Sequence, residues 1–282
     1  MFEIDETSHQ RFQTDGFLVV ERLIAPEEAG AAAERVAPLF RGEFETGLQP
    51  DEWNWREGRD PPELTRQICN AWKADLTLAR ILLAEWIGRS CARLMGWPGA
   101  RLYQDNLIWK PPGAKALGFH QDDSYIDWIE PANMVTCWIA LDDTSAEAGT
   151  MGLARGSHRW PSAPPIAQFH APDDPTSELR AAAREIGVEP EVVPIVVPAG
   201  GGSFHAGGTW HGSEANRGTK PRRSLVAHCL SSDARFNGKR PGPIYGRYVR
   251  FGDDRMDESF FPILWTEDGR RSAFLGSYLA AG

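Results

Sequence analysis

The first hundred residues carry their apolar side chains mainly at helical spacing. Apolar positions recur every three or four residues along Glu27–Phe40, which predicts an amphipathic helix. The clearest helical pattern covers residues 75–95, where Asp75 is a suitable N-cap and Gly96 a suitable end. The short apolar run Phe17–Val20 does not follow this spacing, and we interpret it as a strand.

From about residue 101 the pattern changes to short apolar runs separated by clusters of Gly, Pro, Asn and Asp. No helix-length segment separates most of these runs, so alternating β-α units are not expected. The pattern is typical of a mainly β fold, a sandwich or jelly roll with flanking helices. The predicted strands are Arg101–Lys110, Met134–Leu141, Val192–Val197, Gly202–Ala206 and Arg222–Ser231.

We expect one domain, because no linker or repeat interrupts the chain. Its parts are a helical segment at about 1–100, a jelly-roll core at about 101–232 and a C-terminal loop region at 233–282, all within the single domain 1–282. The proline-rich segment 160–175 is predicted to leave the sheet between two strands. The loops at 40–60 and 232–262 have no clear period, and long loops on a compact domain are candidate lids.

Composition narrows the functional classes. In a chain of 282 residues, 30 Lys+Arg against 39 Asp+Glu give a net charge of -9, which argues against binding nucleic acid or an anionic membrane through bulk charge. No stretch approaches the roughly 18 consecutive apolar residues of a membrane helix, and the acidic start shows no signal-peptide pattern. The 4 cysteines form no Cys-x-x-Cys pair, which is typical of reduced thiols. We therefore expect a cytoplasmic monomer or homodimer that acts on a small molecule.

Metal-ligating residue types gather at two places along the chain. His120 and Asp122 stand two residues apart, and on an extended segment side chains at this spacing point to one face. His211 can supply a third ligand from a distant strand. Two histidines and one carboxylate leave coordination positions free on Fe(II), which suits oxygen chemistry. A His-x-Asp pair alone arises readily by chance, so the prediction depends on the whole group.

An arginine follows the second histidine. The planar guanidinium of Arg222 suits the far carboxylate of a dicarboxylic co-substrate, and the hydroxyl of Ser213 can add a donor. Alternation along the predicted strand favours Arg222 over Arg223 for this role, because the face of Arg223 is otherwise apolar. One face carries Arg222, Ser224, Val226 and His228, and the other carries Arg223, Leu225, Ala227 and Cys229.

At these residues the sequence resembles the phytanoyl-CoA dioxygenase family of Fe(II)/2-oxoglutarate oxygenases. The resemblance covers roughly residues 10–232 in order, which makes it more specific than any single motif. The segments that carry it are Gln13–Val20, Gln104–Gly113, Trp138–Asp143 with Gly149 and Gly156–His158, and His211–Asn216 followed by Pro221–Arg223.

The resemblance implies a double-stranded β-helix, a jelly roll, with Fe(II) as its metal and 2-oxoglutarate as its co-substrate. The implied metal ligands, which are also the catalytic centre, are His120, Asp122 and His211. The implied contacts of 2-oxoglutarate are Arg222 and Ser213 at the far carboxylate, with Asn106 and Trp138 beside it. Such an enzyme uses O₂ to hydroxylate an unactivated C–H bond of a small metabolite and converts 2-oxoglutarate to succinate and CO₂.

Other features leave alternatives open. The candidate substrate contacts are Tyr125, Trp128, His205 and Trp210, for each of which plain packing is an equal alternative. The same cofactors support desaturation, epoxidation or cyclisation, which the sequence does not separate from hydroxylation. A jelly-roll metal protein that does not use 2-oxoglutarate is a further class, and Arg222 and Ser213 argue against it. A binding module with a vestigial site is another, and the intact ligand set argues against that.

Overall fold

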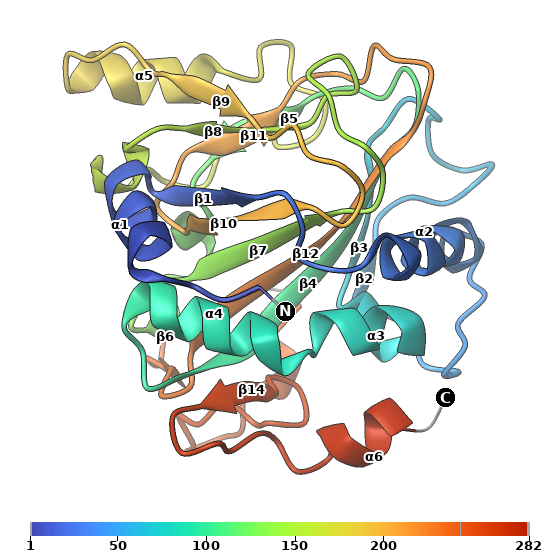
Figure 1. Cartoon of the computed structure of the whole chain (residues 1–282), viewed down its shortest axis with the longest axis vertical. Coiled ribbons are helices and arrows are strands. Elements are labelled where there is room, and N and C mark those ends of the chain that lie inside the picture. Colours follow the sequence, from blue (N-terminus) through green and yellow to red (C-terminus); the bar gives the residue numbers. More distant parts are fainter. Residues whose placement is uncertain (1, 243, 281–282) are drawn as a thin grey trace.

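Two antiparallel β-sheets face each other in the computed structural model, which describes residues 2–242 and 244–280 (Figure 1). The major sheet consists, in spatial order, of β1 (Phe17–Val20), β10 (Gly202–Ala206), β7 (Val135–Ala140), β12 (Arg222–Ser231), β4 (Gly99–Lys110), β3 (Arg66–Cys69) and β2 (Glu52–Trp53), with β14 (Ile263–Thr266) also paired to β4. The minor sheet consists of β5 (Leu117–His120), β11 (His211–Ser213), β8 (Met151–Ala154) and β9 (Val192–Pro194). A separate pair joins β13 (Arg235–Phe236) to β6 (Ile129–Glu130). The jelly-roll fold is confirmed, as an open arrangement of sheets.

Helices cover the outside of the sheets. α4 (Glu85–Met95) lies across β4, β7 and β14, and α3 (Leu76–Leu82) continues along the same face toward α2 (Pro26–Phe40) (Figure 1). The remaining helices are α1 (Glu6–Asp15) before β1, α5 (Ser177–Glu185) beside β5, and α6 (Leu275–Ala280) against α3. Strands β1, β2 and β3 precede residue 101 and β14 follows residue 232, so the major sheet draws on all three expected parts of the chain.

Alternation along the strands of the major sheet separates two cores. Cys137 and Leu225 point outward and pack with helix residues such as Leu82 in the largest apolar cluster. Trp138 and Val226, one position further along each strand, point inward and pack with residues of the minor sheet. Strand β12 therefore shows the expected period of two, and its inward-facing side chains lie between the two sheets.

The single helix expected over residues 75–95 is wrong, because the helix breaks between α3 and α4. Ala84 adopts an extended conformation with φ -67° and ψ 139°. The break leaves the carbonyl of Leu83 free, and the guanidinium of Arg271 donates to it at 2.7 Å. The two predicted helix ends are confirmed. The side chain of Asp75 accepts from the backbone amide of Leu78 at 3.0 Å, and Gly96 has a left-handed φ of 66°.

Most of the minor sheet was not among the predicted strands. The strands β5, β11 and β8 are only three or four residues long, and each contains a glycine. A Cβ at Gly212 would lie 2.5 Å from the ring of Phe119, so a larger residue does not fit between these strands. Strand β9 was expected to reach Val197 and ends at Pro194, because the hydroxyl of Thr144 donates to the carbonyl of Ile195 at 2.8 Å beyond it.

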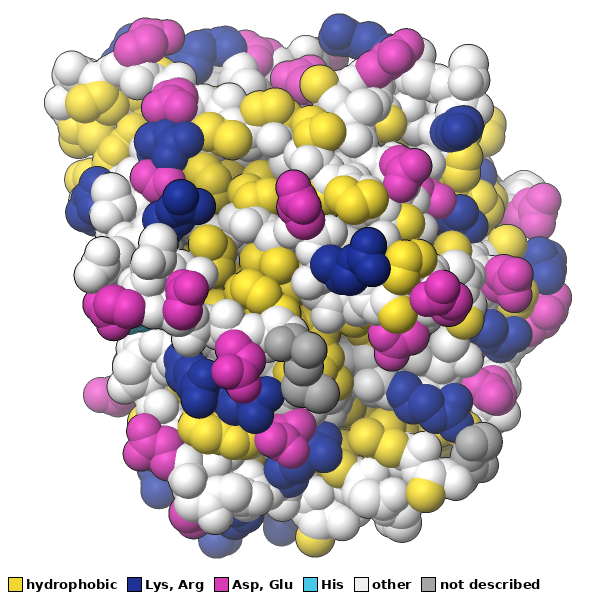
Figure 2. Space-filling model, in the orientation of Figure 1, with side chains coloured by type: hydrophobic (Ala, Val, Ile, Leu, Met, Phe, Trp, Pro, Cys, Tyr) yellow, Lys and Arg dark blue, Asp and Glu magenta, His cyan; other side chains and the backbone are white. Residues whose placement is uncertain are grey.

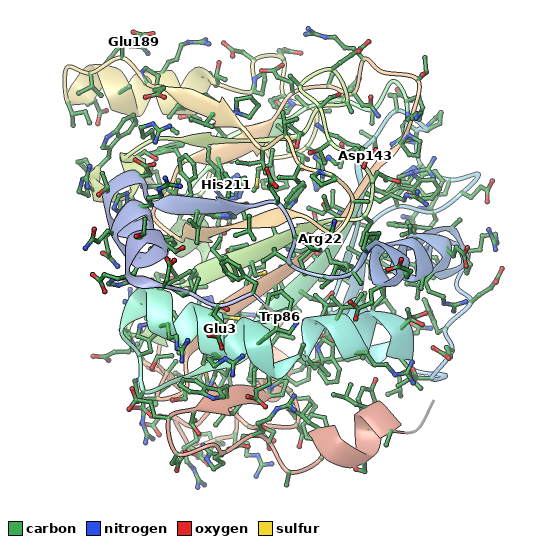
Figure 3. All side chains as sticks on the ribbon, in the orientation of Figure 1. Glu3, Arg22, Trp86, Asp143, Glu189 and His211 are labelled. Carbon is green, nitrogen blue, oxygen red and sulfur yellow. The ribbon has the colours of Figure 1, made fainter. Side chains whose placement is uncertain are left out.

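On the face seen in Figure 2, acidic and basic side chains are interspersed and form no large patch of one sign. Figure 3 shows Glu189 at the outer edge of the same view, whereas His211 lies between the two sheets. No helix in the described part of the chain is long and apolar enough to cross a membrane.

Candidate active site

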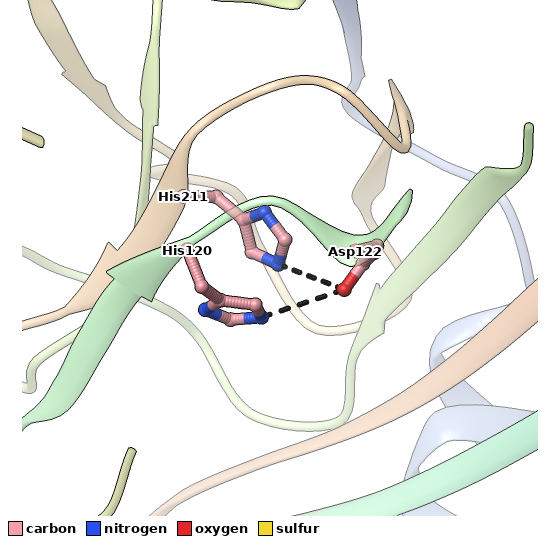
Figure 4. A group of neighbouring side chains, drawn as sticks. All are labelled: His120, Asp122 and His211. Carbon is pink, nitrogen blue, oxygen red and sulfur yellow. Dashed lines mark ion pairs between the residues drawn. The ribbon is translucent and has the colours of Figure 1, made fainter. Parts of the chain in front are cut away.

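The three predicted metal ligands meet in the structure. His120 ends β5 and His211 begins β11, and the two residues are direct partners in the antiparallel pair of these strands. Asp122 lies opposite both rings: its Oδ1 is 3.4 Å from Nε2 of His120 and 3.6 Å from Nε2 of His211 (Figure 4). The candidate ligand atoms all lie within 4.8 Å of one another, and all three side chains are buried.

The segment that carries the first two ligands is not the continuous extended strand that was expected. His120 and Asp122 do share a side, while the amide of Gln121 points away and donates to the carbonyl of Gly208 at 2.7 Å. Asp122, however, starts a 3-10 turn, Asp122–Tyr125. The turn follows directly because the chain must leave the minor sheet here to reach β6 and β7.

Backbone carbonyls fix the orientation of both imidazoles. Nδ1 of His120 lies 2.9 Å from the carbonyl of Gly118, and Nδ1 of His211 lies 3.0 Å from the carbonyl of Thr209. Because a carbonyl only accepts, each Nδ1 carries the proton and each Nε2 presents a lone pair toward Asp122. Burial also lowers the pKa of His211 well below its usual value. Two neutral imidazoles and one carboxylate are a donor set that fits Fe(II).

The second oxygen of Asp122 has different neighbours. Its Oδ2 accepts from the hydroxyl of Thr136 at 2.8 Å and lies 3.4 Å from Nε2 of His205 and 3.5 Å from Nδ1 of His228. One hydroxyl and two imidazoles therefore surround this oxygen on the side away from His120 and His211. The carboxylate is thus ready to bind a cation with Oδ1 while Oδ2 is held from behind.

A cavity of about 550 Å³ opens beside this group. Its volume lies in the range of small-molecule and cofactor sites. Of the residues predicted from the sequence, those that line it are His120, Asp122, His211, Arg222, Ser213, Asn106, Trp138, Tyr125 and His205. The two lid predictions stay predictions; Glu52 and Asn54 from the first loop region and Ile244 from the second line the cavity.

Two of the candidate substrate contacts do not line the cavity. Trp128 is 3% exposed and stacks on Phe236, with ring centroids 5.9 Å apart, beneath the C-terminal segment. Trp210 is 1% exposed and packs with Phe119 and Leu179 on the far side of the minor sheet. Trp210 neighbours His211 in sequence, and the alternation of a strand turns adjacent side chains to opposite faces.

Arg222 is buried at the cavity without a carboxylate partner among the described residues. It is 2% exposed, its Nη1 donates to Ser224 at 3.1 Å and its Nη2 to the carbonyl of Gly149 at 3.1 Å, while Nε has no partner. Burial lowers the pKa of Arg222 to about 10, so the guanidinium stays charged at neutral pH. A buried charge of this kind is costly unless an anion joins it, and an anionic ligand in the cavity would do so.

Lys110 is a functional candidate that the sequence did not reveal. Its buried Nζ donates to Oγ of Ser213 at 2.9 Å and to the backbone carbonyl of Glu214. Burial, together with the charge of Arg222, lowers the pKa of Lys110 well below its usual value. Since Oγ of Ser213 already accepts from Lys110, its own proton is available to a ligand. The parity of β4, which places Lys110 on the face of Asn106, was the signal that could have found it.

Comparison with known proteins identifies the family. Residues 12–224 match the family described as phytanoyl-CoA dioxygenase (PhyH). The chain belongs to this family. Among curated relatives, the multifunctional dioxygenase prhA of Penicillium brasilianum is 25% identical over 227 residues, which are 77% of this chain and 68% of that protein.

Solved structures share the fold. The α-ketoglutarate-dependent carbocyclase SnoK from nogalamycin biosynthesis superimposes with a TM-score of 0.70 and 22% identity over 93% of this chain and 96% of that one. The epimerase SnoN, in complex with Fe³⁺, α-ketoglutarate and nogalamycin RO, gives a TM-score of 0.69 and 21% identity over 92% of this chain and 98% of that one. The family uses Fe(II) and 2-oxoglutarate, so the cofactors inferred from the sequence are confirmed at that level. The protein is an Fe(II)/2-oxoglutarate-dependent oxygenase by family, and the family leaves its reaction open.

Proposed function

We propose that this protein is a hydroxylase of a small metabolite. In the proposed reaction one oxygen atom of O₂ enters a C–H bond of the substrate and the other enters succinate, as 2-oxoglutarate loses CO₂. Fe(II) and the keto acid supply the oxidising power when they are bound. The observation that carries the proposal is Arg222, a buried guanidinium without a carboxylate partner in the described chain, in the same cavity as the His120, Asp122 and His211 ligand group.

The proposed role of each residue follows from its position at the cavity. His120, Asp122 and His211 are proposed to hold Fe(II), and Arg222 lines the same cavity. Arg222 and Ser213 would bind the far carboxylate of 2-oxoglutarate by charge-assisted hydrogen bonds. Asn106 and Trp138 both line the cavity, which supports their proposed place beside the co-substrate.

Aromatic side chains close the other side of the ligand group. The ring of Phe169 packs edge-on against His120, with centroids 4.8 Å apart, and Tyr125 does so at 5.9 Å. These rings limit the access of water to the metal position, which protects the reaction from stray oxidation. Tyr125 and His205 remain the proposed substrate contacts, because they line the cavity and have the ligand group beside them.

The lining also bears on the substrate class. Among the described residues Arg222 is the only Lys or Arg at the cavity wall, so no further cation is present to receive the phosphates of an acyl-CoA. Away from the metal the wall combines Asn54, Gln67 and Gln104 with the apolar Ile166 and Ile244. We therefore propose a moderately apolar small molecule with neutral polar groups as the substrate.

The remaining expectations stay predictions. The four cysteines of the described chain are free and buried, which supports a reducing, cytoplasmic setting. The expected monomer or homodimer also stays a prediction, as does the expected lack of nucleic-acid and membrane partners.

An anaerobic titration tests the proposed function. Fe(II) and then 2-oxoglutarate are added to the metal-free protein, and the weak visible charge-transfer band of a chelated keto acid is recorded. The band should form in the wild type and in Arg223→Ala, and it should be lost in His120→Ala. After admission of O₂, succinate release identifies substrates in a screen, and mass spectrometry of the product separates hydroxylation (one added oxygen) from desaturation or cyclisation (two hydrogens lost).

Two outcomes would redirect the proposal. A protein that binds Fe(II) without forming the band is a metal protein that does not use 2-oxoglutarate. A folded protein that binds no metal is a binding module. Products formed by cyclisation would keep the cofactors and change only the reaction; SnoK, which has the same fold, is a carbocyclase.

A further inference from the structure

A row of polar side chains crosses the inner face of the major sheet behind Asp122. Thr136 on β7 pairs across the sheet with His205 on β10 and with His228 on β12. His228 pairs in turn with Gln104 on β4. Four adjacent strands thus place four polar side chains side by side on the inner face of the sheet.

The hydrogen bonds along this row run in one direction. The hydroxyl of Thr136 has a single proton, which it donates to Oδ2 of Asp122 at 2.8 Å because a carboxylate only accepts. The same Oγ1 lies 2.8 Å from Nδ1 of His228, so it must accept from that nitrogen. His228 is then protonated at Nδ1, and its Nε2 accepts from the amide nitrogen of Asn106 at 3.0 Å.

The far end of the row reaches the part of the cavity away from the metal. Oδ1 of Asn106 accepts from Nε2 of Gln67 at 2.9 Å and from Nε2 of Gln104 at 3.1 Å. The hydroxyl of Tyr245 donates to Oε1 of Gln104, which turns the nitrogen of that amide toward Asn106. Gln67 and Gln104 both line the cavity, so the chain of donors begins where a substrate would lie and ends at a metal ligand.

We propose that Asn106, His228 and Thr136 form a one-directional hydrogen-bond relay that orients the carboxylate of Asp122 and links it to Gln67 and Gln104 at the substrate end of the cavity. The inference rests on the proposed function, because it takes Asp122 as a ligand of Fe(II). Within it, His228 and Thr136 are positioning residues.

The relay has a geometric consequence for the metal position. Because Thr136 holds Oδ2, only Oδ1 of Asp122 faces His120 and His211. A carboxylate held in this way would offer a single oxygen to a metal ion at this site. A carboxylate released from Thr136 can turn and bind through both oxygens.

The first test measures the affinity for Fe(II) by anaerobic calorimetry in the absence of 2-oxoglutarate. Thr136→Val removes the hydroxyl at nearly constant shape, and we expect it to weaken Fe(II) binding by about ten- to a hundredfold, the effect usual for an outer partner of a metal ligand. Thr136→Ser keeps the hydroxyl and should restore most of the affinity. Thr150→Val is the matched control, since Thr150 is also buried and its hydroxyl donates to the backbone carbonyl of Ile195.

The second test needs no metal. Nitrogen-15 NMR of the metal-free protein, with His228 assigned by its loss in His228→Asn, should show the Nδ1–H tautomer. Asn106→Asp replaces the donor by an acceptor, and we expect it to move the proton of His228 to Nε2. This readout stays valid if Thr136→Val fails to fold.

The outcomes separate the two proposals. If the wild type binds Fe(II) and Thr136→Val binds it equally well, the relay is overturned and the proposed function stands. An Nε2–H tautomer of His228 in the wild type likewise overturns the relay alone. A folded wild type that binds no Fe(II) overturns both.

Discussion

The two faces of strand β12 carry neighbouring arginines with opposite surroundings. Arg223, on the outer face, is half-buried and makes a fork of hydrogen bonds to the carboxylate of Asp142, with a further bond to the carbonyl of Ala33 on α2. Arg222, on the inner face, is buried, and its guanidinium donates hydrogen bonds to the hydroxyl of Ser224 and the carbonyl of Gly149. The outer arginine has a carboxylate partner within the protein, whereas the inner one has none among the described residues.

The same division holds along the whole strand. The outer positions Leu225 and Cys229 are completely buried against the helices, where their contribution is to stability. On the inner face, Val226 and His228 line the cavity. Substitutions on the outer face should therefore affect the free energy of unfolding, and substitutions on the inner face should affect the binding of metal and co-substrate.

The largest expected effect is on stability, at the outer face. Leu225→Ala removes a fully buried side chain from the core between sheet and helices, which should lower the free energy of unfolding by about 3 kcal/mol. Urea denaturation of the metal-free protein measures it. Val226→Ala, its neighbour at the cavity wall, should cost about 1.5 kcal/mol or less. Equal losses in the two variants would contradict the division into faces.

Arg222→Ala should produce the largest effect on binding. The loss of charge-assisted hydrogen bonds to the far carboxylate should weaken 2-oxoglutarate binding by about a hundredfold, measured by anaerobic titration of the Fe(II)-loaded protein. The free energy of unfolding should not fall, because the variant removes a buried charge without a carboxylate partner in the described chain. A wild-type affinity for 2-oxoglutarate in this variant would mean that the anion binds elsewhere.

Lys110→Met should have a smaller effect at the same end of the cavity. Without the amine, the hydroxyl of Ser213 is free to rotate, and we expect the affinity for 2-oxoglutarate to fall by about tenfold while Fe(II) binding is retained. A double-mutant cycle with Ser213→Ala checks the reason. The two losses should not add, since both act through one hydroxyl; full additivity would assign Lys110 a separate role.

The smallest effect is expected for Arg223→Ala. Its ion pair with Asp142 is partly exposed to water, with side-chain exposures of 25% and 18%. Breaking it should lower the free energy of unfolding by about 1 kcal/mol, measured by urea denaturation. The affinity for 2-oxoglutarate should remain that of the wild type. A strong loss of that affinity here, with none in Arg222→Ala, would reverse the assignment made from the alternation.

Local pattern was sufficient for several features. The alternation along Arg222–Ser231 separated Arg222 from Arg223, because a strand turns successive side chains to opposite faces whatever it pairs with. The helix ends at Asp75 and Gly96 were equally local. The break between α3 and α4 was not, since a guanidinium far along the chain, that of Arg271, binds the carbonyl that the break exposes. The minor sheet was missed because its strands are short and contain glycines that serve a close approach of neighbours.

By itself, the sequence determined the ligand types, their order along the chain, the family and the face on which Arg222 lies. Only the tertiary structure decided which side chains stand opposite one another. Lys110 reaches Ser213, and His228 meets Thr136 and Asn106, because β4, β7 and β12 pair in one register. Trp128 and Trp210, which flank the ligands in sequence, pack away from the cavity, with Phe236 and with Phe119. Strand register is a property of the assembled sheet: it depends on burying a whole face at once, and no short segment contains that information.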